Sequence, residues 1–488
     1  MAANIYLPSA GLLTDLYQLT MAYGYWKLGR HEQRAVFHLS FRRHPFGGGF
    51  SVACGLEYAI AYLRELKFTQ EDTDYLATLQ GNDGKPLFEP AFFEYLRQMK
   101  FSCDVAAIPE GTVVFPHEPL LRITGPILQC QILETPLLNL MNFSTLIATK
   151  AARICLATKG EPVLEFGLRR AQGVDGALMA SRAAYIGGCS ATSNVLAGKL
   201  FGIPVKGTHA HSWVMSFEEE IDAFDSYARA LPNNCVFLVD TYDTLEGVRK
   251  ACTIGKKLRS SGHKLGGIRL DSGDLAWLSI EARRILDAEG FHDAVIVASN
   301  DLDEQIIASL KEQGAKIAVW GVGTRLVTSY DQPALGGVYK LSAIRVGEQW
   351  QYRIKISEQA VKTSLPGILQ VRRFKDGSES IGDMIFNTET GAGLVLCDPA
   401  DITRRKAIPN HARHEDLLVN VFEKGNCVYK LPQLADIQAR TRAELASFYS
   451  GVKRFINPHT YPVGLDRKLH ELRTELILKA RGAKVAAE

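Results

Sequence analysis

Two histidines separated by one residue, His209 and His211, are the clearest candidates for chemistry in the sequence. They stand in Gly-Thr-His-Ala-His-Ser, directly after a short run at 204–206 that is typical of a strand. Because residues two apart on a strand share a face, both rings could point into one site. This pattern fits three interpretations: a pair of metal ligands, a structural histidine, or a functional histidine that acts as general base or phosphoryl acceptor. The metal interpretation lacks further ligands, because His263 and His292 precede their predicted strands.

A cation and two carboxylates surround a predicted tight turn at 269–274, Arg-Leu-Asp-Ser-Gly-Asp. The guanidinium of Arg269 can pair with a planar carboxylate or phosphate. The carboxylates of Asp271 and Asp274 suit a ribose hydroxyl or Mg²⁺, although a salt-bridged turn would give the same pattern. Arg169 and Arg170 supply a second cationic point. Together with a glycine loop further on, these residues predict a pocket for a small molecule with several negative charges.

That glycine loop is Gly-Val-Gly-Thr at 321–324, and it follows an apolar run. Its backbone N–H groups could bind a phosphate, as the loops after the last strands of a (β/α) barrel commonly do. Ser299, which follows the preceding apolar run, fits the same interpretation. Gly321, Gly323, Thr324 and Ser299 are therefore candidate phosphate-binding residues.

The elements that must position these residues alternate between short apolar runs and helical patterns. The expected strands lie at 162–167, 204–206, 235–239, 267–270, 294–298 and 317–320, with a further possible strand end at 185–188. Such repeated βα units form a parallel sheet. Polar residues follow each run, where a barrel carries its site. We therefore predict an irregular α/β barrel of about seven strands, since 170 residues are fewer than the roughly 250 of a complete barrel.

The 488 residues suggest roughly three structural units. We predict an N-terminal α/β domain at 1–150, an irregular (β/α) barrel with the active site at 151–330, and a β-rich, then helical C-terminal portion at 331–488. An amphipathic helix is expected at 9–30 and a strand at 35–41.

Composition excludes several classes of protein. The net charge of +3 gives no general attraction for nucleic acid. The nine cysteines form an odd count without a C-x-x-C pair, which indicates reduced thiols and a cytoplasmic location. Neither a signal peptide nor a membrane span is expected.

Nine short motifs, in order along the chain, resemble those of the nicotinate phosphoribosyltransferase family. They are Leu-Thr-Asp-Leu-Tyr-Gln-Leu-Thr-Met at 13–21, Phe-Arg-Arg-His-Pro-Phe-Gly-Gly-Gly-Phe at 41–50, Glu-Thr-Pro-Leu-Leu at 134–138, Gly-Leu-Arg-Arg-Ala-Gln-Gly at 167–173, Ser-Asn-Val-Leu-Ala-Gly at 193–198, Gly-Thr-His-Ala-His-Ser at 207–212, Arg-Leu-Asp-Ser-Gly-Asp at 269–274, Gly-Val-Gly-Thr at 321–324 and Gly-Gly-Val-Tyr-Lys-Leu at 336–341.

The resemblance implies that nicotinate and 5-phosphoribosyl 1-pyrophosphate form nicotinate mononucleotide and pyrophosphate, with coupled ATP hydrolysis, in NAD salvage. It also implies Mg²⁺, a homodimer with a shared active site, an N-terminal α/β sandwich-like domain, and a C-terminal segment packing with it. His211 matches the family's phosphorylated histidine and Asp271 the acid near the ribose. Thr324, with Gly321 and Gly323, matches the phosphoribosyl phosphate site.

The same resemblance implies the nicotinate contacts. Tyr17 matches an aromatic residue that stacks on the pyridine ring, in related enzymes from the neighbouring subunit. Thr208 and Arg269 match nicotinate-contacting positions, and Arg169 a second anion contact. Three alternatives remain: a nicotinamide phosphoribosyltransferase, a metal-dependent barrel hydrolase using the His-x-His pair, and a silent metabolite-binding protein.

Overall fold

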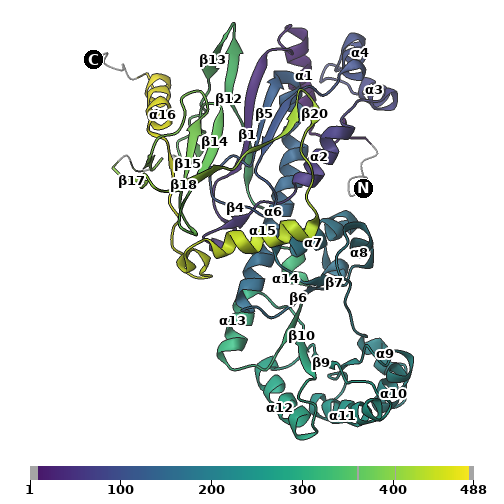
Figure 1. Cartoon of the computed structure of the whole chain (residues 1–488). Coiled ribbons are helices and arrows are strands. Elements are labelled where there is room, and N and C mark those ends of the chain that lie inside the picture. The colour runs from purple at the N-terminus through teal and green to yellow at the C-terminus, as the bar shows by residue number, and fades with distance from the viewer. Residues whose placement is uncertain (1–8, 360–361, 400, 402, 483–488) are drawn as a thin grey trace. The chain divides into compact units, whose positions relative to one another are not determined.

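The computed structural model describes residues 9–359, 362–399, 401 and 403–482, which form two compact units (Figure 1). Unit 1 combines the described residues up to Leu146 with those from Ala334 onward. Unit 2 runs from Ile147 to Pro333. Within the described ranges, no helix is long and apolar enough to span a bilayer.

The main sheet of unit 1 is antiparallel and joins segments from both ends of the chain. In spatial order its strands are β13 (Gln349–Tyr352), β12 (Gly337–Val346), β1 (Arg34–Phe41), β5 (Leu121–Pro126), β3 (Asp104–Ala107), β19 (Val419–Glu423) and β20 (Asn426–Cys427). β1 lies between β12 and β5, so its Leu39 pairs with both Tyr339 and Leu121. Burial on both faces explains why β1 is almost wholly buried despite alternating in sequence.

A second, six-stranded sheet of unit 1 comes almost entirely from the C-terminal portion. Its order is β17 (Arg405–Ala407), β16 (Val395–Cys397), β21 (Val463–Leu465), β15 (Glu379–Asn387), β14 (Leu369–Asp376) and β18 (Arg413–Asp416). A two-stranded sheet pairs β2 (Ser51–Val52) with β4 (Val113–Val114). The helices are α1 (Leu16–Lys27), α2 (Leu56–Glu65), α3 (Gln70–Ala77), α4 (Pro90–Gln98), α5 (Ile127–Ile132), α15 (Leu434–Ala446) and α16 (Arg467–Ala480), and the boundary with unit 2 falls inside α6 (Glu134–Ala157).

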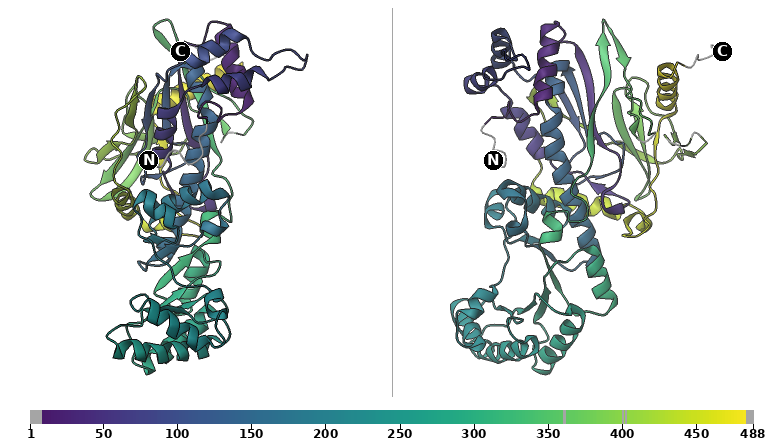
Figure 2. Two further views of the ribbon diagram at one scale, coloured as in Figure 1. Left: turned by 90° about the vertical axis from the view of Figure 1, so that its right-hand side faces the viewer. Right: turned by 180° about the vertical axis from the view of Figure 1, so that it is seen from behind.

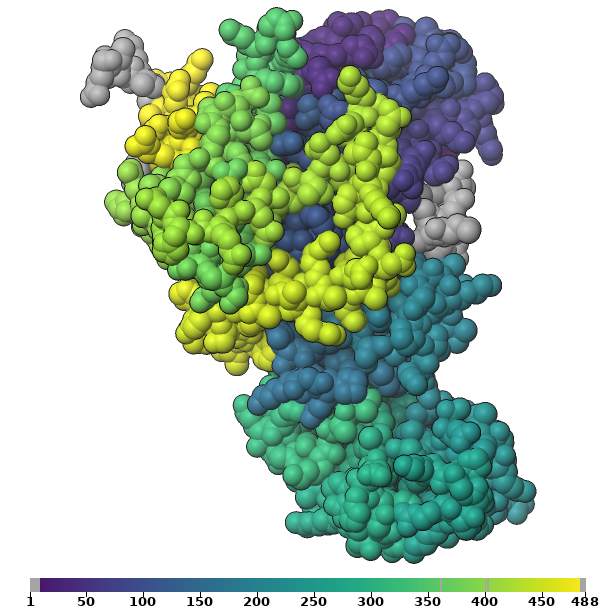
Figure 3. All heavy atoms as spheres, in the orientation of Figure 1, coloured from purple at the N-terminus to yellow at the C-terminus, as the bar shows by residue number. Residues whose placement is uncertain are grey.

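The C-terminal portion packs with the N-terminal one, as expected from sequence. Figure 3 shows the yellow-green chain near α15 on the surface of unit 1. Arg440 of α15 donates to the backbone carbonyl of Glu110, and Glu444 accepts from the backbone N–H of Val113. These contacts make the first and last thirds of the chain one folding unit.

Unit 2 contains a six-stranded parallel sheet of barrel-like α/β type, which confirms the predicted fold class (Figure 2). Its order is β7 (Ala191–Thr192), β6 (Val163–Glu165), β11 (Val319–Val322), β10 (Val295–Ala298), β9 (Gly267–Leu270) and β8 (Val236–Leu238). Its helices are α7 (Gly173–Gly187), α8 (Val195–Phe201), α9 (His211–Met215), α10 (Glu220–Ala230), α11 (Thr244–Ser260), α12 (Leu275–Ala288), α13 (Glu304–Glu312) and α14 (Thr324–Val327).

Side-chain caps start four of these helices directly after a strand. Asn194, Asp243, Asp274 and Asp303 each accept hydrogen bonds from backbone N–H groups in the first turn of α8, α11, α12 and α13. Because the strands are parallel, their carboxyl ends and the loops that lead to these caps lie at one edge of the sheet.

Three local predictions were wrong. The run at 204–206 forms only an isolated bridge from Val205 to Thr192, and the sheet reaches six strands through β7, which was not among the expected strands. The possible strand end at 185–188 is the end of helix α7, where small residues pack closely: a Cβ on Gly187 would lie 2.4 Å from the carbonyl oxygen of Ala148. The helix expected from residue 9 begins at Leu16, after Asp15.

Candidate functional site

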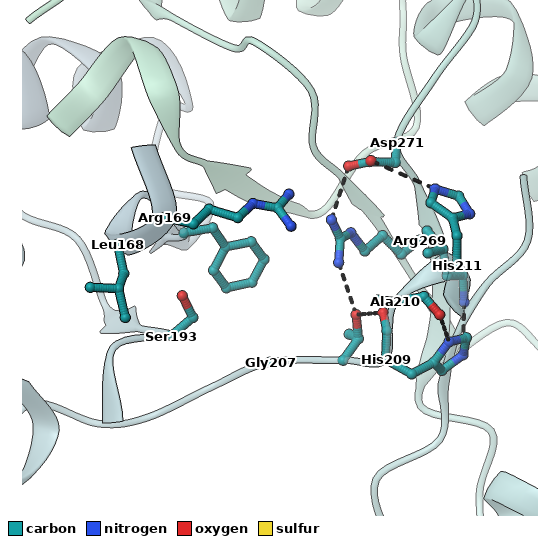
Figure 4. A pocket seen from close by; sticks show the side chains of 12 residues that line it. Leu168, Arg169, Ser193, Gly207, His209, Ala210, His211, Arg269 and Asp271 are labelled. Carbon is teal, nitrogen blue, oxygen red and sulfur yellow. Dashed lines mark hydrogen bonds and ion pairs between the residues drawn. The ribbon is translucent and has the colours of Figure 1, made fainter. Parts of the chain in front are cut away.

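A cavity of about 320 Å³ opens at the carboxyl ends of the unit 2 strands (Figure 4). Residues from four strand ends and the loop before α9 line it: Phe166, Leu168, Arg169, Ser193, Gly207, Thr208, His209, Ala210, His211, Leu238, Arg269 and Asp271. This edge is the one that the sequence predicted from polar residues following each run.

A second, more polar cavity of about 150 Å³ adjoins the first. It shares Phe166, Arg169, Arg269 and Asp271 with the first cavity. Its other lining residues come from the carboxyl ends of β6, β10 and β11 and the segments that follow them: Arg170, Ser299, Asn300, Asp301, Gly321, Gly323 and Thr324. The two cavities together provide one compartment with an aromatic wall and one with hydroxyl groups, amide groups and cations.

Arg269 stands at the junction of the two cavities, and all three of its guanidinium nitrogens are engaged. Nε donates to Ser299 Oγ at 2.8 Å, Nη1 to Thr208 Oγ1 at 3.1 Å, and Nη2 to Asp271 Oδ1 at 2.9 Å. Its guanidinium carbon lies 5.6 Å from the centre of the Phe166 ring. These contacts fix the plane of the guanidinium, which is the condition for directional recognition of a carboxylate or phosphate.

The two histidines of the His-x-His motif have different surroundings. His209 is buried among Phe224, Tyr227 and Phe237, and its Nε2 accepts from the backbone N–H of Leu238. Burial lowers the pKa of His209, and this favours the neutral ring, whose Nε2 lone pair accepts from Leu238.

His211 is the first residue of α9, and it is partly exposed in the first cavity. Its Nδ1 lies 3.0 Å from Thr241 Oγ1 and its Nε2 lies 3.8 Å from Asp271 Oδ2. Residues 207–210 form no strand, so the expectation of two rings on one strand face was wrong. The described residues contain no group of three or more His, Cys, Asp and Glu side chains arranged for a metal ion.

A buried carboxylate that the sequence interpretation missed, Glu165, holds two loops of the pocket. It is 1% exposed at the end of β6. It accepts from the backbone N–H of Gly167, from Ser181 Oγ at 2.8 Å, and from Thr192 Oγ1 at 2.6 Å. Gly167 precedes the turn that carries Arg169, and Thr192 precedes pocket residue Ser193. A lone acid in the apolar run Val-Leu-Glu-Phe was a usable sequence signal, because a buried carboxylate requires partners.

Asp240, at the end of β8, supports the turn that carries Asp271. Its Oδ2 accepts from the backbone N–H of Asp271 at 2.8 Å and from Ser272 Oγ at 2.7 Å. Asp274 instead caps α12 through Ala276 and Trp277, which explains the second carboxylate of that motif without assigning it to the site.

The loops of the second cavity are sterically constrained. Asn300 and Asp301 have φ values of 93° and 40°, two successive non-glycine residues in the left-handed region. A Cβ on Gly321 would lie 2.8 Å from the Phe166 ring, and one on Gly323 would lie 3.1 Å from the Phe166 carbonyl oxygen. The glycines are therefore required by packing on Phe166, a residue that the sequence interpretation also missed.

The structure brings together nine of the ten predicted site residues. Tyr17 is the exception: it lies in unit 1, 48% exposed on α1, near the exposed apolar residues Leu13, Leu16 and Met21. Unit 1 also has its own basic cavity, lined by Arg42, Lys340 and Lys362 among others.

Comparisons with known proteins identify the class. Family models for the N-terminal domain of nicotinate phosphoribosyltransferase, the family proper and the C-terminal domain match residues 12–142, 162–366 and 370–473. The chain is 45% identical to nicotinate phosphoribosyltransferase of Bacillus subtilis, covering 96% of this chain and 97% of that protein. It is 37% identical to the human protein of the same name over 94% of this chain and 95% of that one.

Solved structures agree with the sequence comparison. The crystal structure of human nicotinic acid phosphoribosyltransferase matches with a TM-score of 0.83 at 34% identity, covering 95% of this chain and 100% of that one. The sequence and structure matches define a phosphoribosyl-transferring enzyme of α/β type. The chain belongs to the nicotinate phosphoribosyltransferase family.

Proposed function

We propose that the two adjoining cavities of unit 2 are the substrate sites for nicotinate and 5-phosphoribosyl 1-pyrophosphate. The enzyme has nicotinate phosphoribosyltransferase activity, which places it in NAD salvage; curated relatives of that activity match over nearly its full length. The observation that carries the site assignment is Arg269, whose oriented guanidinium lines both cavities. A planar cation between an aromatic wall and a polar compartment suits a heteroaromatic acid next to a phosphorylated sugar.

In this proposal the first cavity binds nicotinate. Thr208 and Arg269 contact the carboxylate, and Arg169 approaches from the opposite side, as its orientation toward Arg269 in Figure 4 suggests. The second cavity binds the 5-phosphate through Ser299, Thr324 and the loop glycines Gly321 and Gly323. With nicotinate in the first cavity and the phosphorylated sugar in the second, the pyridine nitrogen and the sugar C1 would meet at the boundary that the two cavities share.

The shared boundary suits the charge that develops during the reaction. As the bond from C1 to pyrophosphate breaks, positive charge grows on the ribose and negative charge on the leaving group. Asp271 lines the second cavity, where it would contact the ribose hydroxyls, and Arg170 in the same cavity would supply positive charge to the phosphates. The ring nitrogen attacks with its own lone pair, so the step requires no general base.

The oxygen donors of the second cavity fit a magnesium ion held together with substrate phosphates. Asp271, Asp301, Asn300 and Ser299 offer the carboxylate, amide and hydroxyl oxygens that Mg²⁺ prefers. When bound, the ion would neutralise charge on the leaving pyrophosphate. The residues of this chain would orient it without forming a cage of their own.

ATP coupling would act through His211, the exposed histidine of the motif. Its Nε2 faces Asp271 in the cavity, whereas His209 is neutral, buried and bonded to backbone. A phosphoryl group on His211 would add charge beside Asp271 and change the affinity for phosphorylated ligands. Incubation with γ-³²P-ATP should give acid-labile label on the wild type and none on His211→Ala. His292→Ala, an exposed histidine outside the cavities, is the control; equal labelling of all three would refute the assignment.

We further propose a cytoplasmic homodimer in which Tyr17 of one subunit stacks on nicotinate in the other. The exposed tyrosine and its apolar neighbours on α1 support this, because a contiguous exposed apolar patch is typical of an interface. The test mixes inactive Tyr17→Ala and Arg269→Ala subunits and lets them reassort at random. Half of the dimers should then contain one subunit of each kind, and one of the two sites in such a dimer keeps both residues. The mixture should therefore recover about a quarter of wild-type activity. Activity no higher than the two parents alone would contradict a shared site.

The activity assay supplies nicotinate, 5-phosphoribosyl 1-pyrophosphate, Mg²⁺ and ATP and measures nicotinate mononucleotide. Nicotinate should be turned over at least tenfold more efficiently than nicotinamide, because the amide lacks the charge that Arg269 recognises. Comparable efficiency for both substrates would favour the sister activity on nicotinamide. The metal-hydrolase interpretation would require stoichiometric zinc in the purified protein.

A further inference from the structure

The loop after β8 contacts two residues of the first cavity: Thr241 lies against the His211 ring, and Asp240 accepts from the backbone N–H of Asp271. We propose that Thr241 is a positioning residue for His211: its hydroxyl accepts the Nδ1–H of the ring and leaves the Nε2 lone pair facing the cavity. This inference rests on the proposed phosphorylation of His211 and assigns the nitrogen that reacts.

The distances distinguish the two neighbours of the ring. Thr241 Oγ1 lies 3.0 Å from Nδ1, within hydrogen-bond distance. Asp271 Oδ2 lies 3.8 Å from Nε2, too far for a hydrogen bond. Arg269 and Ser299 Oγ both donate to the other oxygen of that carboxylate, Oδ1. Thr241 is therefore the side chain whose hydrogen bond orients the ring, and in our proposal its hydroxyl is the acceptor in that bond.

The backbone that carries Thr241 is held on both sides. Before it, the N–H of Val239 donates to the carbonyl oxygen of Arg269, which joins β8 to β9. After it, Asp243 caps α11, and Gly247 approaches so closely that a Cβ there would lie 2.2 Å from the Val239 carbonyl oxygen. The adjacent Asp240 accepts from the Asp271 backbone N–H. One strand end thus fixes both Asp271 and His211.

The proton position decides which nitrogen can react. A neutral imidazole has one N–H and one lone pair, so a proton held on Nδ1 leaves the lone pair on Nε2. In the transfer, the Nε2 lone pair forms the N–P bond to the γ-phosphorus of ATP while the bond to the bridging oxygen breaks. ADP leaves with that electron pair. The ring keeps its Nδ1 proton, held by Thr241, until the proton is released to water.

The test uses the full-length protein with ¹⁵N-labelled histidine. Two-bond ¹H–¹⁵N correlations report the tautomer of each ring, and His211→Asn identifies the signals of His211. We expect the Nδ1–H form in the wild type and the Nε2–H form in Thr241→Val, which keeps the side-chain shape but removes the acceptor. The rate of labelling by γ-³²P-ATP should fall about tenfold in Thr241→Val and stay within about twofold in Thr241→Ser.

Thr253→Val, an exposed threonine on α11, is the matched control and should leave both the tautomer and the labelling rate unchanged. An Nε2–H tautomer in the wild type, or a Thr241→Val variant with wild-type tautomer and labelling, would overturn the proposal. Full labelling of His211→Asn would instead refute the phosphohistidine assignment, and the tautomer comparison would then decide the role of Thr241 alone.

Discussion

Glu165→Gln offers a direct test of how the pocket is built. The substitution keeps the size of the side chain but replaces a carboxylate by one acceptor oxygen and one donor nitrogen. The native carboxylate serves three donors: the Gly167 backbone, Ser181 and Thr192. Neither hydroxyl can easily turn to accept from the new amide, because Asn194 already donates to both of them.

The expected magnitude follows from these bonds. Hydrogen bonds to a charged acceptor contribute about 1.5–3 kcal/mol and neutral ones about 0.5–1.5 kcal/mol, and an unpaired buried donor costs roughly 1–3 kcal/mol. Relief of the buried charge offsets part of the loss. We therefore expect the free energy of unfolding to fall by about 2–4 kcal/mol. Loosening of Gly167 and Thr192 should displace Arg169 and Ser193, and raise the KM for nicotinate about tenfold.

Urea unfolding and steady-state kinetics measure the two effects separately. Glu161→Gln is the matched control, because Glu161 lies before the amino end of the same strand, where it accepts from Trp320 Nε1 at 2.7 Å and pairs with Lys311. It should lose stability without a change in KM. If Glu165→Gln also leaves KM within about twofold while stability falls, the carboxylate supports the fold of unit 2 and does not shape the pocket.

Three further predictions concern recognition, pH and the core of unit 1. Arg269→Lys keeps the charge but loses the planar fork, so the KM for nicotinate should rise at least about tenfold with a smaller change in kcat; an unchanged KM would remove Arg269 from the nicotinate site. Burial lowers the pKa of His44 to about 3, so the folded state binds fewer protons than the unfolded state and loses stability as pH falls below about 6.5. Between pH 7.5 and 5 this loss should be about 1–2 kcal/mol in urea titrations and should disappear in His44→Asn; a loss of the same size in that variant would contradict it. Asp383→Asn removes a partner of the fully buried Arg373 and should cost about 3–5 kcal/mol in unfolding free energy, measured by denaturant titration, and a cost below about 1 kcal/mol would show that the pair is dispensable.

Much of the site could be predicted from sequence because its signals are local. Apolar runs followed by polar residues identified the strand ends, and the arginine and aspartate at 269 and 271 are separated by only one residue in the chain. Strand and helix periodicity reflects only near neighbours, so it survives without knowledge of the fold.

Other features depend on partners far apart in sequence. The carboxylate of Glu165 is satisfied by Ser181 and Thr192, and β1 pairs with β12 some three hundred residues later. No local pattern shows which donors will bind a buried carboxylate, or which distant strand will pair with a given strand of the sheet.

The histidine pair shows the division most clearly. The sequence by itself determined that 207–212 carries two candidate rings, and motif order assigned the second to chemistry. Only the tertiary structure shows the physical difference between them, because His209 packs among aromatic rings and bonds the backbone of β8, whereas His211 opens α9 in the cavity beside Thr241 and Asp271. Burial and hydrogen-bond partners set the charge state and accessibility of an imidazole, and both are properties of packing and not of spacing.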